Sequence, residues 1–146
     1  MPDNQLVAWL TDRAELHELF NRYLRTPDED RFDREWLESL FTDDITVDYT
    51  FVRHEGLEGM AKFARGFFSR FARVQHVGTN CLAEIDGDRA KVRANVIASH
   101  VPDADDPTAR FTIGGAYDID AVRTPKGWRY QTLNERIVWT SGAAQG

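Results

Sequence analysis

The 146 residues of the chain fall within the size of one domain, and a domain of this length can fold without a metal ion or a disulfide. The 18 lysine and arginine residues against 24 acidic residues give a net charge of −6 with no basic cluster, which argues against nucleic acid and anionic membrane surfaces as partners. The single Cys81 excludes an internal disulfide and fits a reducing compartment. The chain start lacks the features of a secretory signal, and no apolar stretch approaches the roughly 20 residues that span a bilayer. We therefore expect one cytoplasmic domain over residues 1–146, with a core from about 6 to 142.

The first half of the chain has helical periodicity. Apolar residues recur every three to four positions from Leu6 to Leu24, and Asp3 or Asn4 can cap this first helix, which we expect to end at Thr26-Pro27. A short second helix is predicted over residues 34–41, capped by Asp33. A third is predicted over residues 57–72, where apolar residues share one face.

Strands follow the helices. Alternating apolar residues predict a half-buried strand over residues 45–51, and three long strands are expected after Val74. Asp86-Gly87 suits a tight hairpin, residues 103–107 a longer loop, and residues 125–127 a turn. Helices before antiparallel strands indicate an α+β fold, in which the helices cover one face of a curved sheet and leave an enclosed, cone-shaped space. Such a space is a natural small-molecule site.

Several polar residues occupy positions that the periodicity assigns to the interior. Burying an unpaired polar group costs about 1 to 3 kcal/mol, so each such residue needs a partner or a function. Tyr23 lies on the apolar stripe of the first helix and Asp28 follows that helix. The other inward positions are on the strands and hold Tyr49, His76, His100, Tyr117 and Arg136.

Each of these residues also has a structural interpretation. Asp28 suits a turn after Pro27, and an inward histidine is often only a hydrogen-bonded core residue. The tyrosines can be core aromatics with tethered hydroxyl groups, and Arg136 can pair with a carboxylate at the rim. A carboxylate, an imidazole and phenols around one cavity together favour chemistry over packing.

Other kinds of site find little support in the sequence. The four histidines have no metal-site spacing, and no Gly-rich phosphate or dinucleotide motif or G-x-S-x-G motif is present. We therefore expect neither a metal nor a cofactor.

Six segments carry a family resemblance: residues 14–23, 40–44, 75–80, 113–117, 127–129 and 138–139. Through them the chain, from about residue 6 to 142, resembles the SnoaL-like branch of the nuclear transport factor two-like superfamily. It is most similar to the scytalone dehydratase, bile acid 7α-dehydratase and hexachlorocyclohexane dehydrochlorinase group. The resemblance implies a cystatin-like α+β barrel and a cofactor-free lyase that uses an Asp–His dyad.

The resemblance also implies roles for individual residues. The dyad falls on Asp28 and His76, while Tyr23 and Tyr49 match pocket tyrosines, and these four are the expected catalytic residues. Substrate-binding positions are expected at His100, Tyr117, Arg136 and Asn80. Scytalone dehydratase has Ser and Asn in the strand where this chain has residues 114–117, so the resemblance implies a reaction type and not scytalone as substrate.

The sequence thus predicts a dehydratase-type lyase acting on a hydrophobic polycyclic or polyketide-like molecule through Asp–His general base catalysis. A polyketide cyclase or ketosteroid-type isomerase is an alternative, because the same residues abstract a proton there and no group leaves. A non-catalytic binding module, or a relative of the small subunit of ring-hydroxylating dioxygenases, is another. Family members usually associate, so a homo-oligomer is expected, with a trimer favoured over a dimer.

Overall fold

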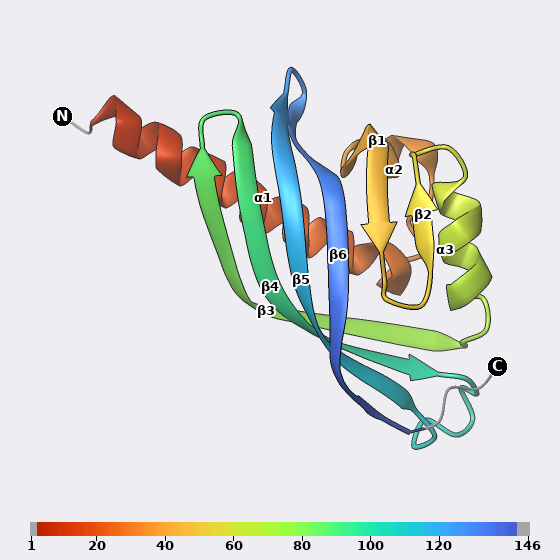
Figure 1. Cartoon of the computed structure of the whole chain (residues 1–146). Coiled ribbons are helices and arrows are strands. Elements are labelled where there is room, and N and C mark those ends of the chain that lie inside the picture. Colours follow the sequence, from red (N-terminus) through yellow and green to blue (C-terminus); the bar gives the residue numbers. More distant parts are fainter. Residues whose placement is uncertain (1–2, 143–146) are drawn as a thin grey trace.

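The computed structural model describes residues 3–142, which form three helices and a six-stranded sheet (Figure 1). The helices are α1 (Asn4–Asp28), α2 (Arg34–Glu38) and α3 (Met60–Phe68). The strands are β1 (Phe41–Asp48), β2 (Arg53–Glu55), β3 (Arg73–Asp86), β4 (Arg89–Val101), β5 (Phe111–Thr124) and β6 (Gly127–Ser141). The predicted α+β fold with helices on a curved sheet is confirmed.

The sheet differs from the prediction in four respects. Its strand order is β2-β1-β6-β5-β4-β3, and β1 runs parallel to β6, so the sheet is mixed where an antiparallel one was expected. The order begins at β2 and ends at β3, so the sheet is open and not a closed barrel. Four long strands, and not three, follow α3, and β2 was not predicted.

Boundaries of the first two helices follow from their end residues. The Asp3 side chain accepts a hydrogen bond from the backbone N–H of Gln5 and caps α1 as expected. This helix runs one residue past Pro27, because the backbone N–H of Glu29 still donates to the carbonyl of Arg25 (2.9 Å). Asp33 caps α2, which is shorter than predicted because Phe41 already begins β1.

The third helix is also shorter than predicted, and β1 begins and ends earlier than the strand predicted over residues 45–51. The helix was predicted to begin at Leu57, but the backbone N–H of Leu57 donates to the carbonyl of Asp43 (2.9 Å), which holds this residue outside the helix. Helix α3 therefore begins only at Met60. Strand β1 ends at Asp48, before Tyr49, and Phe51 is 77% exposed in the turn that leads to β2.

Helix α1 determines the position of the site, since it packs along β3 and brings its last turn to the start of that strand. The first turns of α1 extend beyond the β3–β4 hairpin in Figure 1, and Leu6 and Leu10 are therefore exposed, although the periodicity predicted them to be buried. Farther along, the buried Asp12 accepts two hydrogen bonds from Arg123 (2.7 and 2.9 Å) and one from the Trp128 ring (3.0 Å). These bonds from β5 and β6 fix the helix on the sheet, and the Arg123 hydrogen bonds hold the pKa of Asp12 below its ordinary value.

Two of the β-bulges change which of the predicted site residues face the interior. On β3, Thr79 pairs with Asn95 and Leu82 with Arg93, so two residues oppose one, and Asn80 has a positive φ of 57°. On β6, Tyr130 pairs with Ala121 and Thr132 with Asp120, so Gln131 is the extra residue. Each bulge reverses the period-two alternation downstream of it.

No helix within residues 3–142 combines the length and the apolar character needed to cross a membrane.

Candidate active site

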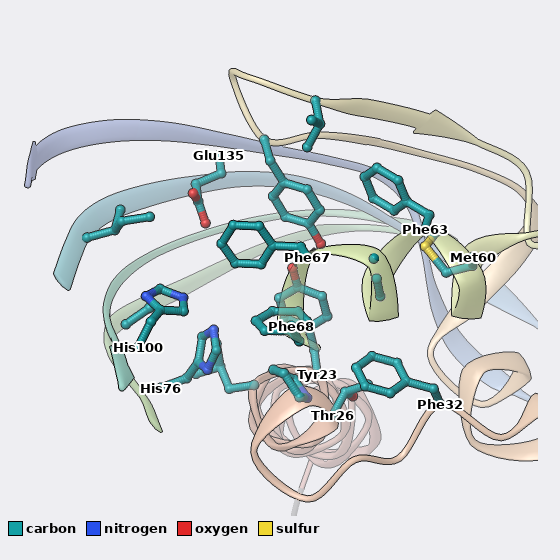
Figure 2. A pocket seen from close by; sticks show the side chains of 18 of the residues that line it. Tyr23, Thr26, Phe32, Met60, Phe63, Phe67, Phe68, His76, His100 and Glu135 are labelled. Carbon is teal, nitrogen blue, oxygen red and sulfur yellow. Dashed lines mark hydrogen bonds between the residues drawn. The ribbon is translucent and has the colours of Figure 1, made fainter. Parts of the chain in front are cut away.

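A cavity of about 490 Å³ lies between the concave face of the sheet and the helices, and this volume is in the range of small-molecule sites. Helix α3 contributes aromatic side chains on one side, while α1 and strands β3 to β6 contribute the other walls (Figure 2). Most of the lining is apolar. The polar side chains that line it are Tyr23, Thr26, Tyr49, Arg70, His76, His100, Tyr117 and Glu135.

Asp28 and His76 are in direct contact. The Nδ1 of His76 lies 2.7 Å from Oδ1 of Asp28, and the backbone N–H of His76 donates to Oδ2 (2.8 Å). Their side chains are 20% and 9% exposed respectively. The carboxylate therefore holds the imidazole through both the ring and the main chain.

Two features of the fold produce this contact. Asp28 is the last residue of α1, and β3 is an edge strand, so an outward N–H of β3 has no neighbouring strand to bond. The Asp28 carboxylate accepts the backbone N–H of His76, and this hydrogen bond brings the carboxylate beside the imidazole ring of His76. Because a carboxylate only accepts, Nδ1 of His76 carries a proton, and the lone pair of the neutral ring lies on Nε2. His76 lines the cavity, whereas Asp28 is not among the residues that line it.

Tyr23 and Tyr49 form a hydrogen-bonded pair with their hydroxyl oxygens 2.6 Å apart. One hydroxyl proton bridges the two oxygens, so the other remains available to a ligand. Burial raises the pKa of both tyrosines, which keeps them protonated as donors at neutral pH. Tyr117 packs edge-on against Tyr23 with ring centroids 5.7 Å apart, and burial raises its pKa as well.

His100 is almost fully buried among phenylalanines and lines the same cavity, with its ring centroid 6.1 Å from that of His76. Its Nδ1 lies 2.9 Å from the carbonyl of Phe111, so this nitrogen donates and Nε2 is an acceptor in the neutral ring. Burial lowers the pKa of His100, and this histidine is therefore neutral near pH 7.

Two residues predicted at the site lie outside the cavity. Asn80 and Arg136 are exposed and are not among its lining residues. Strict alternation along β3 from His76 and Gly78 would turn the side chain of Asn80 inward, but the bulge in β3 turns it outward. Likewise, Arg136 was placed inward because it shares even numbering with Tyr130 of the same strand, and the bulge at Gln131 breaks this alternation between the two residues.

Glu135 lines the cavity in place of Arg136 and was not predicted. It pairs directly across the sheet with Tyr117, and Figure 2 shows it on the same side of the cavity as the two histidines. Burial raises its pKa, while Tyr117 and His76 act in the opposite direction. The bulge has no glycine or proline to mark it, so the sequence offers no signal for this reversal.

Within residues 3–142, no three His, Cys, Asp or Glu side chains gather in a way that can hold a metal ion.

Comparison with known proteins gives consistent results. The SnoaL-like domain family matches residues 8–134. An uncharacterised protein of Mycobacterium tuberculosis is 33% identical over 127 residues, which cover 84% of this chain and 83% of the relative.

Solved structures show the same likeness. The Kfla4162 protein of Kribbella flavida is 32% identical with a TM-score of 0.82, over 90% of this chain and 93% of that protein. A hexachlorocyclohexane dehydrochlorinase from Novosphingobium barchaimii has a TM-score of 0.80 over 94% of each chain, and its 20% identity shows a shared fold alone. On the match over residues 8–134 and these relatives, the chain belongs to the SnoaL-like family of the nuclear transport factor two-like superfamily.

Proposed function

We propose that the protein is a cofactor-independent lyase that removes water from a hydrophobic cyclic substrate, with His76 as general base. The observation that carries this proposal is the contact between Asp28 and His76. It fixes the proton on Nδ1 and leaves the basic Nε2 for the cavity.

The first step is removal of a proton from the carbon next to a substrate carbonyl. Nε2 of His76 takes that proton, and the adjacent Asp28 carboxylate stabilises the imidazolium that forms. Negative charge develops on the carbonyl oxygen, and the free hydroxyl proton of the Tyr23–Tyr49 pair stabilises it by a hydrogen bond. The electron pair then forms a C=C bond as the β-substituent leaves.

The lining of the cavity favours an apolar ring system as substrate. Phe63, Phe67 and Phe68 of α3 contribute aromatic surface on one wall, and Ile113 and Ile137 of the sheet contribute aliphatic surface. Polar groups are few and lie near the two histidines and the tyrosine pair. This distribution suits a polyketide-like or polycyclic ketone that carries a hydroxyl group β to its carbonyl.

The proposal is tested with a panel of β-hydroxy ketones that carry one, two or three fused rings, incubated with the protein in deuterated buffer. Loss of one water molecule, measured by mass spectrometry, together with deuterium exchange at the α-carbon is the expected result. Deuterium exchange without water loss would indicate an isomerase or cyclase. A panel that shows neither exchange nor water loss would contradict the proposed function.

We also propose that the protein self-associates through the outer face of the sheet. Val77, Ile97, Gly114 and Trp139 pair in register across β3, β4, β5 and β6, which places them in one row. Val77, Ile97 and Trp139 are 53%, 43% and 44% exposed, and an exposed apolar row of this kind marks a contact surface.

A trimer is expected in light scattering, with a dimer as the other association number. Trp139→Ser is expected to shift the particle mass toward that of one chain, since Trp139 is the largest side chain in the row. A single-chain mass for the unsubstituted protein would contradict self-association.

A further inference from the structure

Glu135 has a position that packing does not explain. It projects from β6 into a cavity with mostly apolar walls, and it is the one carboxylic acid in the cavity lining within residues 3–142. No lysine, arginine or histidine of the described chain lies within ion-pair distance of it. Burial in such surroundings disfavours the charged carboxylate relative to the protonated carboxyl group.

The proposed elimination also lacks a proton donor for the leaving group. Hydroxide is a poor leaving group, and the C–O bond breaks readily only when the oxygen is protonated as it departs. His76 cannot supply this proton at the outset, because its Nε2 must be unprotonated to act as the base. A separate acid in the same cavity lets the C–O bond break while His76 is still taking the α-proton.

The other polar groups of the cavity are poorer donors than Glu135. His100 is neutral and commits its Nδ1–H to the Phe111 carbonyl. The phenols of Tyr23, Tyr49 and Tyr117 have pKa values raised above the ordinary tyrosine value by burial, so they hold their protons too tightly for efficient transfer. The Nε–H of Arg70 is committed to the carbonyl of Phe67 (3.3 Å), and its guanidinium lies over the ring of Phe67.

We propose that Glu135 is the general acid that protonates the leaving oxygen, and that the natural substrate therefore carries a hydroxyl leaving group. This inference rests on the proposed function. His76 takes the α-proton, the C–H electron pair becomes the C=C bond, and the C–O bond breaks as the Glu135 proton passes to oxygen. The products are the unsaturated ketone and water. The imidazolium proton then returns to the Glu135 carboxylate through solvent, so protons and electrons balance over the cycle.

Burial supports this assignment, because it raises the pKa of Glu135 above that of an ordinary glutamate. The interactions with Tyr117 and His76 act in the opposite direction on this pKa. The titratable groups that line the same cavity are Tyr23, Tyr49, Arg70, His76, His100 and Tyr117.

A leaving-group comparison tests the proposal with two probes that give the same product. 4-Hydroxy-4-phenylbutan-2-one loses water and its acetate ester loses acetate, and both yield 4-phenylbut-3-en-2-one, which is followed by its ultraviolet absorbance. Acetate departs without a proton. Glu135→Gln is expected to slow the hydroxyl probe by about a hundredfold, because general acid catalysis contributes at least about a hundredfold to a rate. The same variant is expected to slow the acetate probe by less than about threefold. A control on an exposed carboxylate of β3, Glu84→Gln, is expected to change neither rate.

The outcomes separate this inference from the proposed function. Equal slowing of both probes by Glu135→Gln, or no slowing of the hydroxyl probe, would overturn the general-acid role. No turnover of either probe by the unsubstituted protein would count against the proposed lyase activity.

Infrared difference spectra of the unsubstituted protein against Glu135→Gln at neutral pH test the acid without any substrate. A protonated-carboxyl band that disappears in the variant is expected, and its absence from the unsubstituted protein would overturn the inference. Glu135→Asp gives a second test by partial rescue of the hydroxyl probe, should the Gln variant fold poorly.

Discussion

Replacing Asp28 by Asn is expected to slow water elimination by about a hundredfold or more without loss of the fold. The amide of the Asn variant can still accept the backbone N–H of His76 through its oxygen, but its NH₂ group then faces Nδ1. Nδ1 must accept that hydrogen bond, so the ring proton moves to Nε2. A ring with N–H toward the cavity cannot take a proton from the substrate, and the general base is lost.

His76→Ala is expected to slow elimination to the same extent, and the double variant is expected to be no slower than His76→Ala alone, because the two residues act as one unit. Initial rates with a β-hydroxy ketone and circular dichroism measure the two effects. Asp30→Asn, which removes an exposed carboxylate two residues away, is the matched control and is expected to retain full activity. Full activity in both Asp28→Asn and His76→Ala would remove the dyad from the mechanism.

Gly78→Ala is expected to lower the free energy of unfolding by about 1 to 3 kcal/mol, as overpacking of a close-packed interface does. A Cβ at this position would overlap with the side chains of Leu24 and Phe20, which are only 6% and 3% exposed and have little room to move. Helix α1 must therefore shift away from β3. Asp28 lies one turn beyond Leu24, and His76 lies two residues before Gly78, so the same shift separates the dyad.

Thermal unfolding and the elimination rate test this expectation together. The rate of Gly78→Ala is expected to fall even at temperatures where the variant is fully folded, since the dyad depends on the helix–strand distance. Gly66→Ala in α3 is the control for stability, because nothing lies within 4 Å of a Cβ there and alanine favours a helix. Its melting temperature is expected to stay level or rise. An unchanged melting temperature in Gly78→Ala would show that α1 and β3 adapt without strain.

The sequence is informative about this fold where periodicity is unbroken. The alternation in β4 places small residues and His100 inward, and the structure agrees from Ala90 to His100. Likewise, the apolar stripe of the first helix leads to Asp28, and His76 follows in a strand of matching phase, so the two side chains meet as the periodicity and the resemblance suggested.

Periodicity fails where a bulge inserts a residue. Arg136 was assigned inward by counting in twos, and this count crosses a bulge, as does the same count from His76 to Asn80. An extra residue in a strand is accommodated by the pairing with the neighbouring strand, which is long-range information that a local pattern does not contain. Glu135 remained hidden for the same reason.

The bulge at Gln131 also decides which chemical group β6 presents to the cavity. Glu135 and Arg136 are adjacent and point to opposite sides of β6. If β6 paired with β5 without this bulge, Gln131 would lie opposite Asp120, and plain alternation from Tyr130 would turn Arg136 inward and Glu135 to solvent. A change of register by one residue, with no substitution, would thus replace a carboxyl group by a guanidinium cation inside the cone.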